Sequence, residues 1–125
     1  MNRIVCKFGG SSVADAAQFR KVQAIVDADE RRTIVVPSAP GKRTSEETKI
    51  TDLLYLCHEM AGMRTDFTGP FNTIRDRFLE IERELGLKAD MAERLESFRK
   101  ELQAGCTRDH AASRGEFFNG LAQGG

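Results

Sequence analysis

The chain has 125 residues, and its 19 lysines and arginines balance its 19 aspartates and glutamates, so its formal net charge at pH 7 is zero. A length of this order fits one ordinary domain or part of a larger one. The balanced charge excludes an overall positive field of the kind that attracts nucleic acids or anionic membranes. With 40% hydrophobic and 30% charged residues, the composition is typical of a soluble globular protein.

The sequence gives no sign of targeting to a membrane or of secretion. No apolar run approaches the roughly 20 residues that span a bilayer, and the N-terminal segment lacks the extended apolar stretch of a secretory signal. The three cysteines, Cys6, Cys57 and Cys106, are odd in number and widely spaced, which favours reduced thiols over a disulfide framework. We therefore expect a cytoplasmic protein without a membrane or nucleic-acid partner.

The N-terminal part of the chain predicts a strand, a turn, a helix and a second strand. Residues 3–8 include the β-branched Ile4 and Val5 and are followed by Gly9 and Gly10, a pattern typical of a strand that enters a tight turn. Apolar residues at helical spacing predict a helix over about residues 14–28. Residues 33–36, Thr-Ile-Val-Val, predict a strand too apolar to have a solvent-exposed face, so it should lie inside a covered sheet. Together these elements predict a βαβ unit with a right-handed crossover.

The rest of the chain predicts mostly helices. Residues 37–48 are polar and indicate a loop, and helical spacing resumes at Ile50. Two apolar stripes follow, and the short Gly-Leu-Lys-Ala-Asp connection between them indicates an antiparallel helical hairpin. The stripes comprise Phe71, Ile74, Phe78, Ile81 and Leu85, and then Met91, Leu95, Phe98 and Leu102. The final segment, residues 107–121, is expected to begin another helix.

The turn after the first predicted strand has features that suit a phosphoryl group. Lys7, Phe8, Gly9, Gly10 and Ser11 lead from the strand into the following helical segment. Glycines let backbone N–H groups approach an anion without a Cβ in the way, and a helix N-terminus and Lys7 add positive charge. The lysine precedes the glycines, so this is not the P-loop pattern. A plain strand-to-helix turn with an exposed lysine is the alternative.

A second candidate loop begins at Ser38, directly after the second predicted strand, and continues through Ala-Pro-Gly to Lys42. Ligands of parallel α/β sheets bind beyond the carboxyl ends of the strands. Both loops are therefore expected to open on the same edge of the sheet and to share a site. A solvated loop without a ligand is the alternative reading of this segment.

Two polar groups farther along the chain are candidates for substrate contacts. Thr51 begins the next predicted helix and could present its hydroxyl to a polar substrate, although Thr51 or Asp52 could instead be a helix N-cap. Glu116 closes a Ser-Arg-Gly-Glu segment, and in a cleft its carboxylate could hold a substrate ammonium group. A weak surface pair with Arg114 is the alternative for Glu116.

Four potential zinc ligands do not form a zinc-binding motif. Cys57, His58, Cys106 and His110 provide thiols and imidazoles, but no Cys-x2-Cys pair accompanies them. Cys57 lies on the apolar face of its predicted helix, so packing in the core explains it. We therefore predict no protein-bound metal site.

Four motifs, taken in order, resemble the aspartate kinases of the amino acid kinase superfamily. They are Lys-Phe-Gly-Gly-Ser-Ser-Val from Lys7, Val-Val-Pro-Ser-Ala-Pro-Gly-Lys from Val35, Lys-Ile-Thr-Asp-Leu-Leu from Lys49 and Ser-Arg-Gly-Glu from Ser113. The resemblance spans residues 1–125 but covers only the N-terminal part of the kinase domain of a family member. It implies a three-layer α/β/α amino acid kinase-like fold, present here as an incomplete, helix-rich N-terminal segment with two parallel strands.

The resemblance also implies an activity and its nucleotide. The parent enzyme would phosphorylate the β-carboxylate of L-aspartate with ATP, giving 4-phospho-L-aspartate, the first step towards lysine, threonine and methionine. Lys7 would be the catalytic residue that contacts the ATP phosphates and stabilises charge on the transferred group. Phe8, Gly9, Gly10 and Ser11 would form the phosphate-binding turn beside it. Mg²⁺ would enter with the nucleotide.

On the aspartate side, the resemblance implies that Ser38 and Thr51 line the substrate pocket and that Glu116 binds the substrate amino group. L-aspartate and ATP are the expected small-molecule partners, and the full-length parent is expected to be a homo-oligomer. Pro37 stands where the family has an apolar strand residue, and we interpret it as the end of the strand.

The resemblance also shows what this chain lacks. The family's later Gly-Arg-Gly-Gly-Ser-Asp segment, the rest of its kinase domain and its regulatory ACT domains are absent from the 125 residues. Without the later strands, an exposed sheet edge is expected, and the chain alone is expected to be inactive. Another amino acid kinase, acting on glutamate or N-acetylglutamate, is one alternative. A non-catalytic fragment that packs or binds a partner through its apolar stripes is another.

Overall fold

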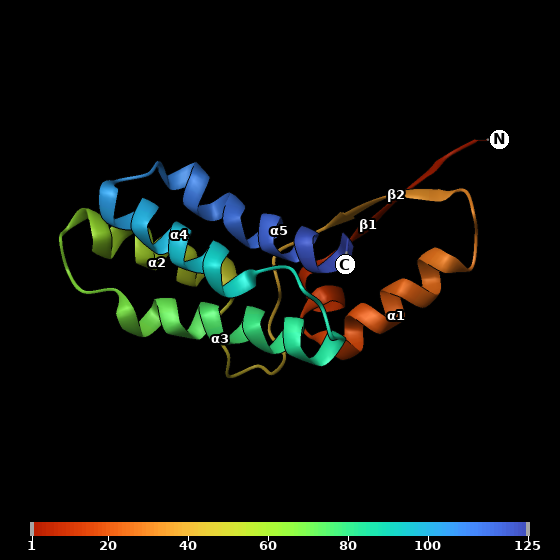
Figure 1. The fold of residues 1–125 in the computed structure, drawn as a ribbon, viewed down its shortest axis with the longest axis horizontal. Helices are drawn as coiled ribbons and strands as arrows, with labels where there is room; N and C mark the ends of the chain where they lie inside the picture. Colours follow the sequence, from red (N-terminus) through yellow and green to blue (C-terminus); the bar gives the residue numbers. More distant parts are fainter. Residues whose placement is uncertain (1, 125) are drawn as a thin grey trace.

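The computed structural model of the chain describes residues 2–124 and has two strands and five α-helices. In chain order the elements are β1 (Ile4–Phe8), the short 3-10 helix η1 (Gly10–Val13), α1 (Ala16–Asp27), β2 (Arg32–Pro37), α2 (Ile50–Gly62), α3 (Thr68–Leu85), α4 (Met91–Ala104) and α5 (Arg108–Gly124). Helices α2 to α5 lie together at one end of the molecule, and α1 and the strands lie at the other (Figure 1). Within residues 2–124, no helix is both long and apolar enough to cross a membrane.

Strands β1 and β2 pair in parallel, with Val5 opposite Ile34 and Lys7 opposite Val36. Helix α1 connects them, so the predicted strand–helix–strand order is confirmed. The helix begins where Asp15, its N-cap, accepts a hydrogen bond from the Gln18 backbone N–H at 3.0 Å. This cap satisfies one of the backbone donors that a helix start leaves free. The unit brings the carboxyl ends of both strands to one edge of the sheet.

One face of the sheet is exposed, and the expectation of a fully covered sheet was wrong for the part of the chain that the structure describes. Val5, Ile34 and Val36 are 61%, 42% and 43% exposed. The alternating residues Val35 and Pro37 are half-buried and, with residues of α1 and α5, line a cavity on the opposite face. Because α1 and α5 both contact β2 from that one side, Val5 and its neighbours have no covering helix.

The two predicted apolar stripes form the core of the helical end. Their buried members are Phe71, Ile74, Phe78, Ile81, Met91, Leu95, Phe98 and Leu102. Phe118 of α5 joins them, and its ring centroid lies 5.3 Å from that of Phe78 and 6.1 Å from that of Phe98. The last helix runs through Gly115 to Gly124, beyond the expected end at residue 121, and it uses Gly115 as a buried packing position.

The connection between α3 and α4 is fixed by the side chain of one residue. Gly86 takes a left-handed φ of 66° just after α3, and the Leu87 N–H donates to the Glu82 carbonyl at 3.0 Å. This is a common way to end a helix on glycine. The Glu82 carboxylate then accepts from the backbone N–H groups of Ala89 and Met91, each at 3.1 Å. Glu82 therefore caps the start of α4 from α3 and confirms the predicted hairpin.

Candidate active site

The loops that follow β1 and β2 are in direct backbone contact. The Ser38 N–H donates to the Phe8 carbonyl at 3.1 Å, and the Gly41 N–H donates to the Gly10 carbonyl at 2.8 Å. This contact follows from the parallel pairing, because the carboxyl ends of neighbouring parallel strands lie at one edge. The expectation that both loops open on the same edge is confirmed.

Two glycines allow this close approach. A Cβ at Gly41 would lie 2.6 Å from the Gly10 carbonyl carbon and 2.7 Å from the Ser11 nitrogen, both backbone atoms. A Cβ at Gly115 of α5 would lie 2.6 Å from the Ala39 Cβ. All three distances are shorter than a Cβ contact allows, so a residue without a side chain is required at each position. Gly115 thus lets α5 approach the second loop just before Glu116.

A cavity of about 520 Å³ opens where these loops meet the start of α2 and the middle of α5. It is lined by Gly10, Ser11, Ser38, Ala39, Pro40, Gly41, Lys42, Lys49, Thr51 and Glu116. Five residues that the sequence predicts as site residues, namely Gly10, Ser11, Ser38, Thr51 and Glu116, are therefore brought together around one cavity, although they come from four separate segments.

The other three predicted site residues lie on the approach to this cavity and do not line it. Lys7 is exposed near the end of β1, opposite Val36. Phe8 is half-buried, and its carbonyl carries the hydrogen bond from Ser38. Gly9 is extended and directly precedes η1. The predicted turn from strand into helical segment is confirmed, and a short 3-10 helix that the sequence did not predict precedes α1.

Two lysines that the sequence did not single out, Lys42 and Lys49, also line the cavity. They stand near the beginning and the end of the loop between β2 and α2, and both are exposed. Glu116 is the only carboxylate residue among the lining residues. Two ammonium groups and one carboxylate suit a ligand that carries more negative than positive charge. The signal available in the sequence was a lysine at either end of a polar loop.

The start of α2 decides between the two interpretations of Thr51. The N-cap residue is Lys49, and no side chain makes a cap hydrogen bond there. Thr51 and Asp52 therefore lie within the first turn, and the N-cap alternative was wrong for both. Thr51 lines the cavity, whereas Asp52 is exposed and adds a negative charge to a helix N-terminus, where it is stabilising.

The loop from β2 to α2 is tied down by ion pairs that Arg43 makes. Its guanidinium bonds to the Glu47 carboxylate at 2.7 Å within the loop and to Glu80 of α3 at 2.9 Å. The hydrogen bonds from Arg43 lower the pKa of Glu47 to about 2. Arg43 therefore links this loop to α3.

Two buried polar side chains reach the loops from the helical end, and sequence reasoning missed both. Arg77 of α3 and Asn119 of α5 are buried and donate hydrogen bonds to loop carbonyls. Burial lowers the pKa of Arg77, and the nearby Glu47 carboxylate opposes that shift. The signal in the sequence was a charged residue three positions after Ile74, at the border of an apolar stripe.

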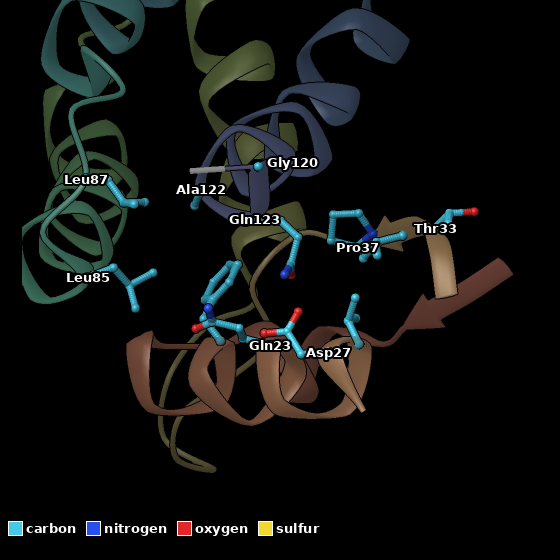
Figure 2. Close-up of a pocket in the computed structure, with 13 residues that line it drawn as sticks. Gln23, Asp27, Thr33, Pro37, Leu85, Leu87, Gly120, Ala122 and Gln123 are labelled. Atoms are coloured by element: carbon cyan, nitrogen blue, oxygen red, sulfur yellow. The ribbon is translucent and has the colours of Figure 1, made fainter. Parts of the chain in front are cut away.

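A slightly larger cavity, of about 560 Å³, lies elsewhere, between α1, β2 and the end of α5 (Figure 2). None of the predicted site residues lines it. Its polar side chains are those of Gln23, Asp27, Thr33 and Gln123, and no lysine or arginine is among the lining residues. A cavity with a carboxylate and no cation does not suit a phosphate, so the smaller cavity is the better candidate site.

The cysteines and histidines that could ligate zinc are instead buried or in contact with other protein groups. Cys57 is buried, and burial raises the pKa of its thiol to about 11. The His58 Nε2 donates to the Cys106 carbonyl at 2.9 Å, and the His110 ring contacts the Glu101 carboxylate. Among residues 2–124, no three His, Cys, Asp or Glu side chains are grouped so that they could hold a metal ion.

Comparison with known proteins places the chain in a family. The model of the amino acid kinase family matches residues 2–123. The chain belongs to the amino acid kinase family. Among relatives of this amino acid kinase chain, aspartokinase 3 of Bacillus subtilis is 42% identical over 91 residues, covering 73% of the chain and 20% of the relative. An aspartokinase of Chlamydia trachomatis is 34% identical over 90 residues, covering 71% of the chain and 18% of the relative.

Solved structures agree with this amino acid kinase assignment. The aspartate kinase of Clostridium acetobutylicum matches with a TM-score of 0.92 and 48% identity, over 95% of this chain and 28% of that one. E. coli aspartokinase III, in complex with aspartate and ADP, matches with a TM-score of 0.74 and 26% identity, over 98% of this chain and 28% of that one. The chain thus spans between 18% and 28% of the length of these relatives. The incomplete amino acid kinase fold and the resemblance to aspartate kinases are both confirmed.

Proposed function

We propose that the natural polypeptide containing this chain phosphorylates the β-carboxylate of L-aspartate with ATP, and that the chain contributes part of the active site. The observation that carries the proposal is the shared cavity, which joins the glycine turn to Ser38, Thr51 and Glu116. The relatives of this chain support aspartate as the acceptor, since they are aspartokinases and one structural neighbour was solved with aspartate and ADP.

On the nucleotide side, the turn after β1 binds the phosphates. Backbone N–H groups around Gly9 and Gly10 approach the phosphate oxygens without a Cβ in the way. The Lys7 ammonium stabilises the charge that spreads over the transferred group in the transition state. Glu116 is the only carboxylate residue that lines the cavity. Mg²⁺ therefore enters bound to ATP rather than to a protein site in the described part of the chain.

On the acceptor side, the residues provide complementary charges and donors. The Glu116 carboxylate binds the α-ammonium group of aspartate, and the hydroxyls of Ser38 and Thr51 hydrogen-bond to its polar groups. An oxygen of the β-carboxylate attacks the γ-phosphorus in line, the bond from that phosphorus to the ADP oxygen breaks, and 4-phospho-L-aspartate and ADP leave. Lys42 and Lys49 attract both anionic substrates to the cavity.

The test is a panel of acceptors given to the natural polypeptide with ATP and Mg²⁺. ADP release is followed with L-aspartate, L-glutamate and N-acetyl-L-glutamate, and hydroxylamine traps any acyl phosphate as a hydroxamate. We expect aspartate-dependent ADP release and aspartyl hydroxamate, with little turnover of the other two. A preference for glutamate or N-acetylglutamate contradicts the proposal, as does the absence of aspartate-dependent ADP. The 125-residue chain, assayed in parallel, is expected to be inactive.

A further inference from the structure

A single amide nitrogen of Asn119 bridges the two loops of the candidate site. The side chain is fully buried in α5. Its Nδ2 donates to the Val13 carbonyl at 3.2 Å and to the Ser38 carbonyl at 2.8 Å. Val13 ends the turn that follows β1, and Ser38 begins the loop that follows β2. One nitrogen therefore holds a carbonyl of each loop.

Arg77 repeats this arrangement from another helix. Its side chain lies on α3 and is 4% exposed. Its Nη2 donates to the carbonyls of Ala14 and Gly41, each at 2.8 Å. Ala14 directly follows η1, and Gly41 belongs to the second loop. The two helices thus bridge the same two loops, each through one nitrogen atom.

Stability alone does not account for either side chain. A buried guanidinium loses its hydration, and an apolar side chain of similar size is often tolerated as well or better at such positions. Arg77 is bonded to carbonyls and not to a carboxylate. Within residues 2–124, the Oδ1 of Asn119 is buried and has no hydrogen-bond partner, which is unfavourable. In some proteins, buried polar groups of this kind fix a geometry.

The geometry that they fix is the width of the cavity. The direct hydrogen bond from Gly41 N–H to the Gly10 carbonyl joins the same loops. Gly10, Ser38 and Gly41 all line the cavity. A change in either bridge therefore moves the walls of the cavity, although neither Arg77 nor Asn119 is among the lining residues.

We propose that Asn119 and Arg77 are positioning residues, which hold the phosphate-binding turn and the Ser38 loop at a fixed separation so that the two substrates meet in line. This inference rests on the proposed function, in which one loop binds ATP phosphates and the other binds aspartate. Both residues act through backbone carbonyls. In-line transfer is sensitive to such positioning, since a displacement of about 1 Å can lower a rate by about 100-fold.

A matched pair of variants tests the Arg77 bridge in the natural polypeptide. Arg77→Met keeps an unbranched side chain about as long as the aliphatic stem of arginine and removes the nitrogen that donates to both carbonyls. Arg77→Lys restores a positively charged nitrogen with three donors, on a side chain one bond shorter than that of arginine. We expect Arg77→Met to lower kcat/KM for aspartate by about 10- to 100-fold, and Arg77→Lys to recover most of that loss. A merely structural role would not be rescued in kcat/KM by restoring the donor nitrogen.

The Asn119 bridge is tested by a change of polarity at constant shape. Asn119→Asp turns the donating nitrogen into an oxygen that repels the Val13 and Ser38 carbonyls. We expect a raised KM for aspartate and faster amide hydrogen exchange over residues 38–42. Asn119→Ser, which retains one smaller donor, gives a milder form of both effects and replaces Asn119→Asp should that variant not fold.

The control is Leu102→Ala, which leaves a cavity in the core at the last turn of α4. This turn lies at the end of the helical bundle away from the sheet (Figure 1). The variant is expected to lower Tm without changing KM for aspartate or exchange over residues 38–42. The proposal is overturned if Arg77→Met keeps the wild-type kcat/KM for aspartate and Asn119→Asp keeps the wild-type KM and exchange, or if Leu102→Ala reproduces their effects. If the wild type does not phosphorylate aspartate, the proposed function fails, and the exchange rates alone still decide the positioning role.

Discussion

The two ends of this molecule are built in different ways. At the helical end, α2 to α5 enclose an apolar core in which Phe118 packs against Phe78 and Phe98. At the sheet end, two strands share a single ladder, and Val5 is 61% exposed on the uncovered face. The core of the helical end continues into η1 and α1 through Val13, Phe19 and Val22, whereas the outer face of the sheet is left exposed among residues 2–124.

The candidate site lies between these two ends, and its parts come from both. The sheet end provides the two loops, and the helical end provides Thr51, Glu116 and the buried bridges of Arg77 and Asn119. The contrast indicates a division of roles. The well-packed helices hold the geometry, whereas the loops at the carboxyl ends of the strands carry the groups that would meet the substrates.

The largest expected effect on stability tests the contrast between the two ends. Phe118→Ala removes a ring from the helical core and should lower the free energy of unfolding by about 3–5 kcal/mol. Ile34→Ala on the exposed sheet face should change it by about 0.5 kcal/mol or less. Denaturant unfolding of the 125-residue chain measures both. Similar losses for the two variants would contradict the account of the two ends.

Glu116→Gln tests whether the carboxylate of this α5 residue binds the aspartate ammonium group. The variant keeps the shape and removes the charge that pairs with the aspartate ammonium, so KM for aspartate should rise by about 10- to 100-fold. The KM for ATP should change little. Glu59→Gln, on an exposed position of α2, is the matched control. Equal KM values for aspartate in the two variants would contradict the proposal that Glu116 binds the aspartate ammonium group.

Gly41→Ala tests the close approach of the loops. The new Cβ would lie 2.6 Å from the Gly10 carbonyl carbon, so the backbone must move apart. We expect a loss of about 1–3 kcal/mol in the free energy of unfolding, with a fall in kcat. Gly62→Ala, whose Cβ has no atom within 4 Å, should be tolerated. If Gly41→Ala is as stable and active as Gly62→Ala, the loops are not held in contact.

The smallest expected effect concerns the ion pair inside the second loop. Hydrogen bonds from Arg43 lower the pKa of Glu47 to about 2 in the folded chain, against an ordinary value of 4.5. The pair therefore contributes stability above about pH 4.5, and this contribution is lost as the pH falls towards 2. Because the pair is partly exposed, its size is about 0.5 kcal/mol. In Glu47→Gln, the fall in the free energy of unfolding between pH 4.5 and pH 2 should be smaller than in the wild type by that amount. The same pH dependence in the variant and the wild type would contradict a stabilising pair between Arg43 and Glu47.

Local patterns were sufficient to predict most of the fold. The β-branched run before Gly9 and the three-four spacing from Phe71 onward identified their elements, because strand alternation and helical periodicity are local properties. The meeting of the two loops was also predictable, since parallel pairing alone brings Phe8 and Ser38 to one edge. Helix ends differed by a few residues, and α5 extended through Gly115 because tertiary packing uses that glycine.

Long-range contacts were not predictable from the sequence. Arg77 and Asn119 bond to carbonyls of residues distant in the chain, and no local pattern marks which loop a buried polar side chain reaches. The exposed face of Ile34 was missed for a related reason. An apolar strand indicates a sheet that is covered on both faces, but whether the covering elements lie within a given set of residues depends on the rest of the fold.

In the proposed function, the turn after β1 binds the ATP phosphates and Lys7 is the catalytic residue. The most direct measurement is the rate of aspartate-dependent ADP formation by the natural polypeptide with Lys7→Ala, beside Lys21→Ala, an exposed lysine of α1, as the control. The account predicts that Lys7→Ala lowers kcat by about 100- to 1,000-fold and that Lys21→Ala leaves it unchanged. Normal turnover by Lys7→Ala would contradict it.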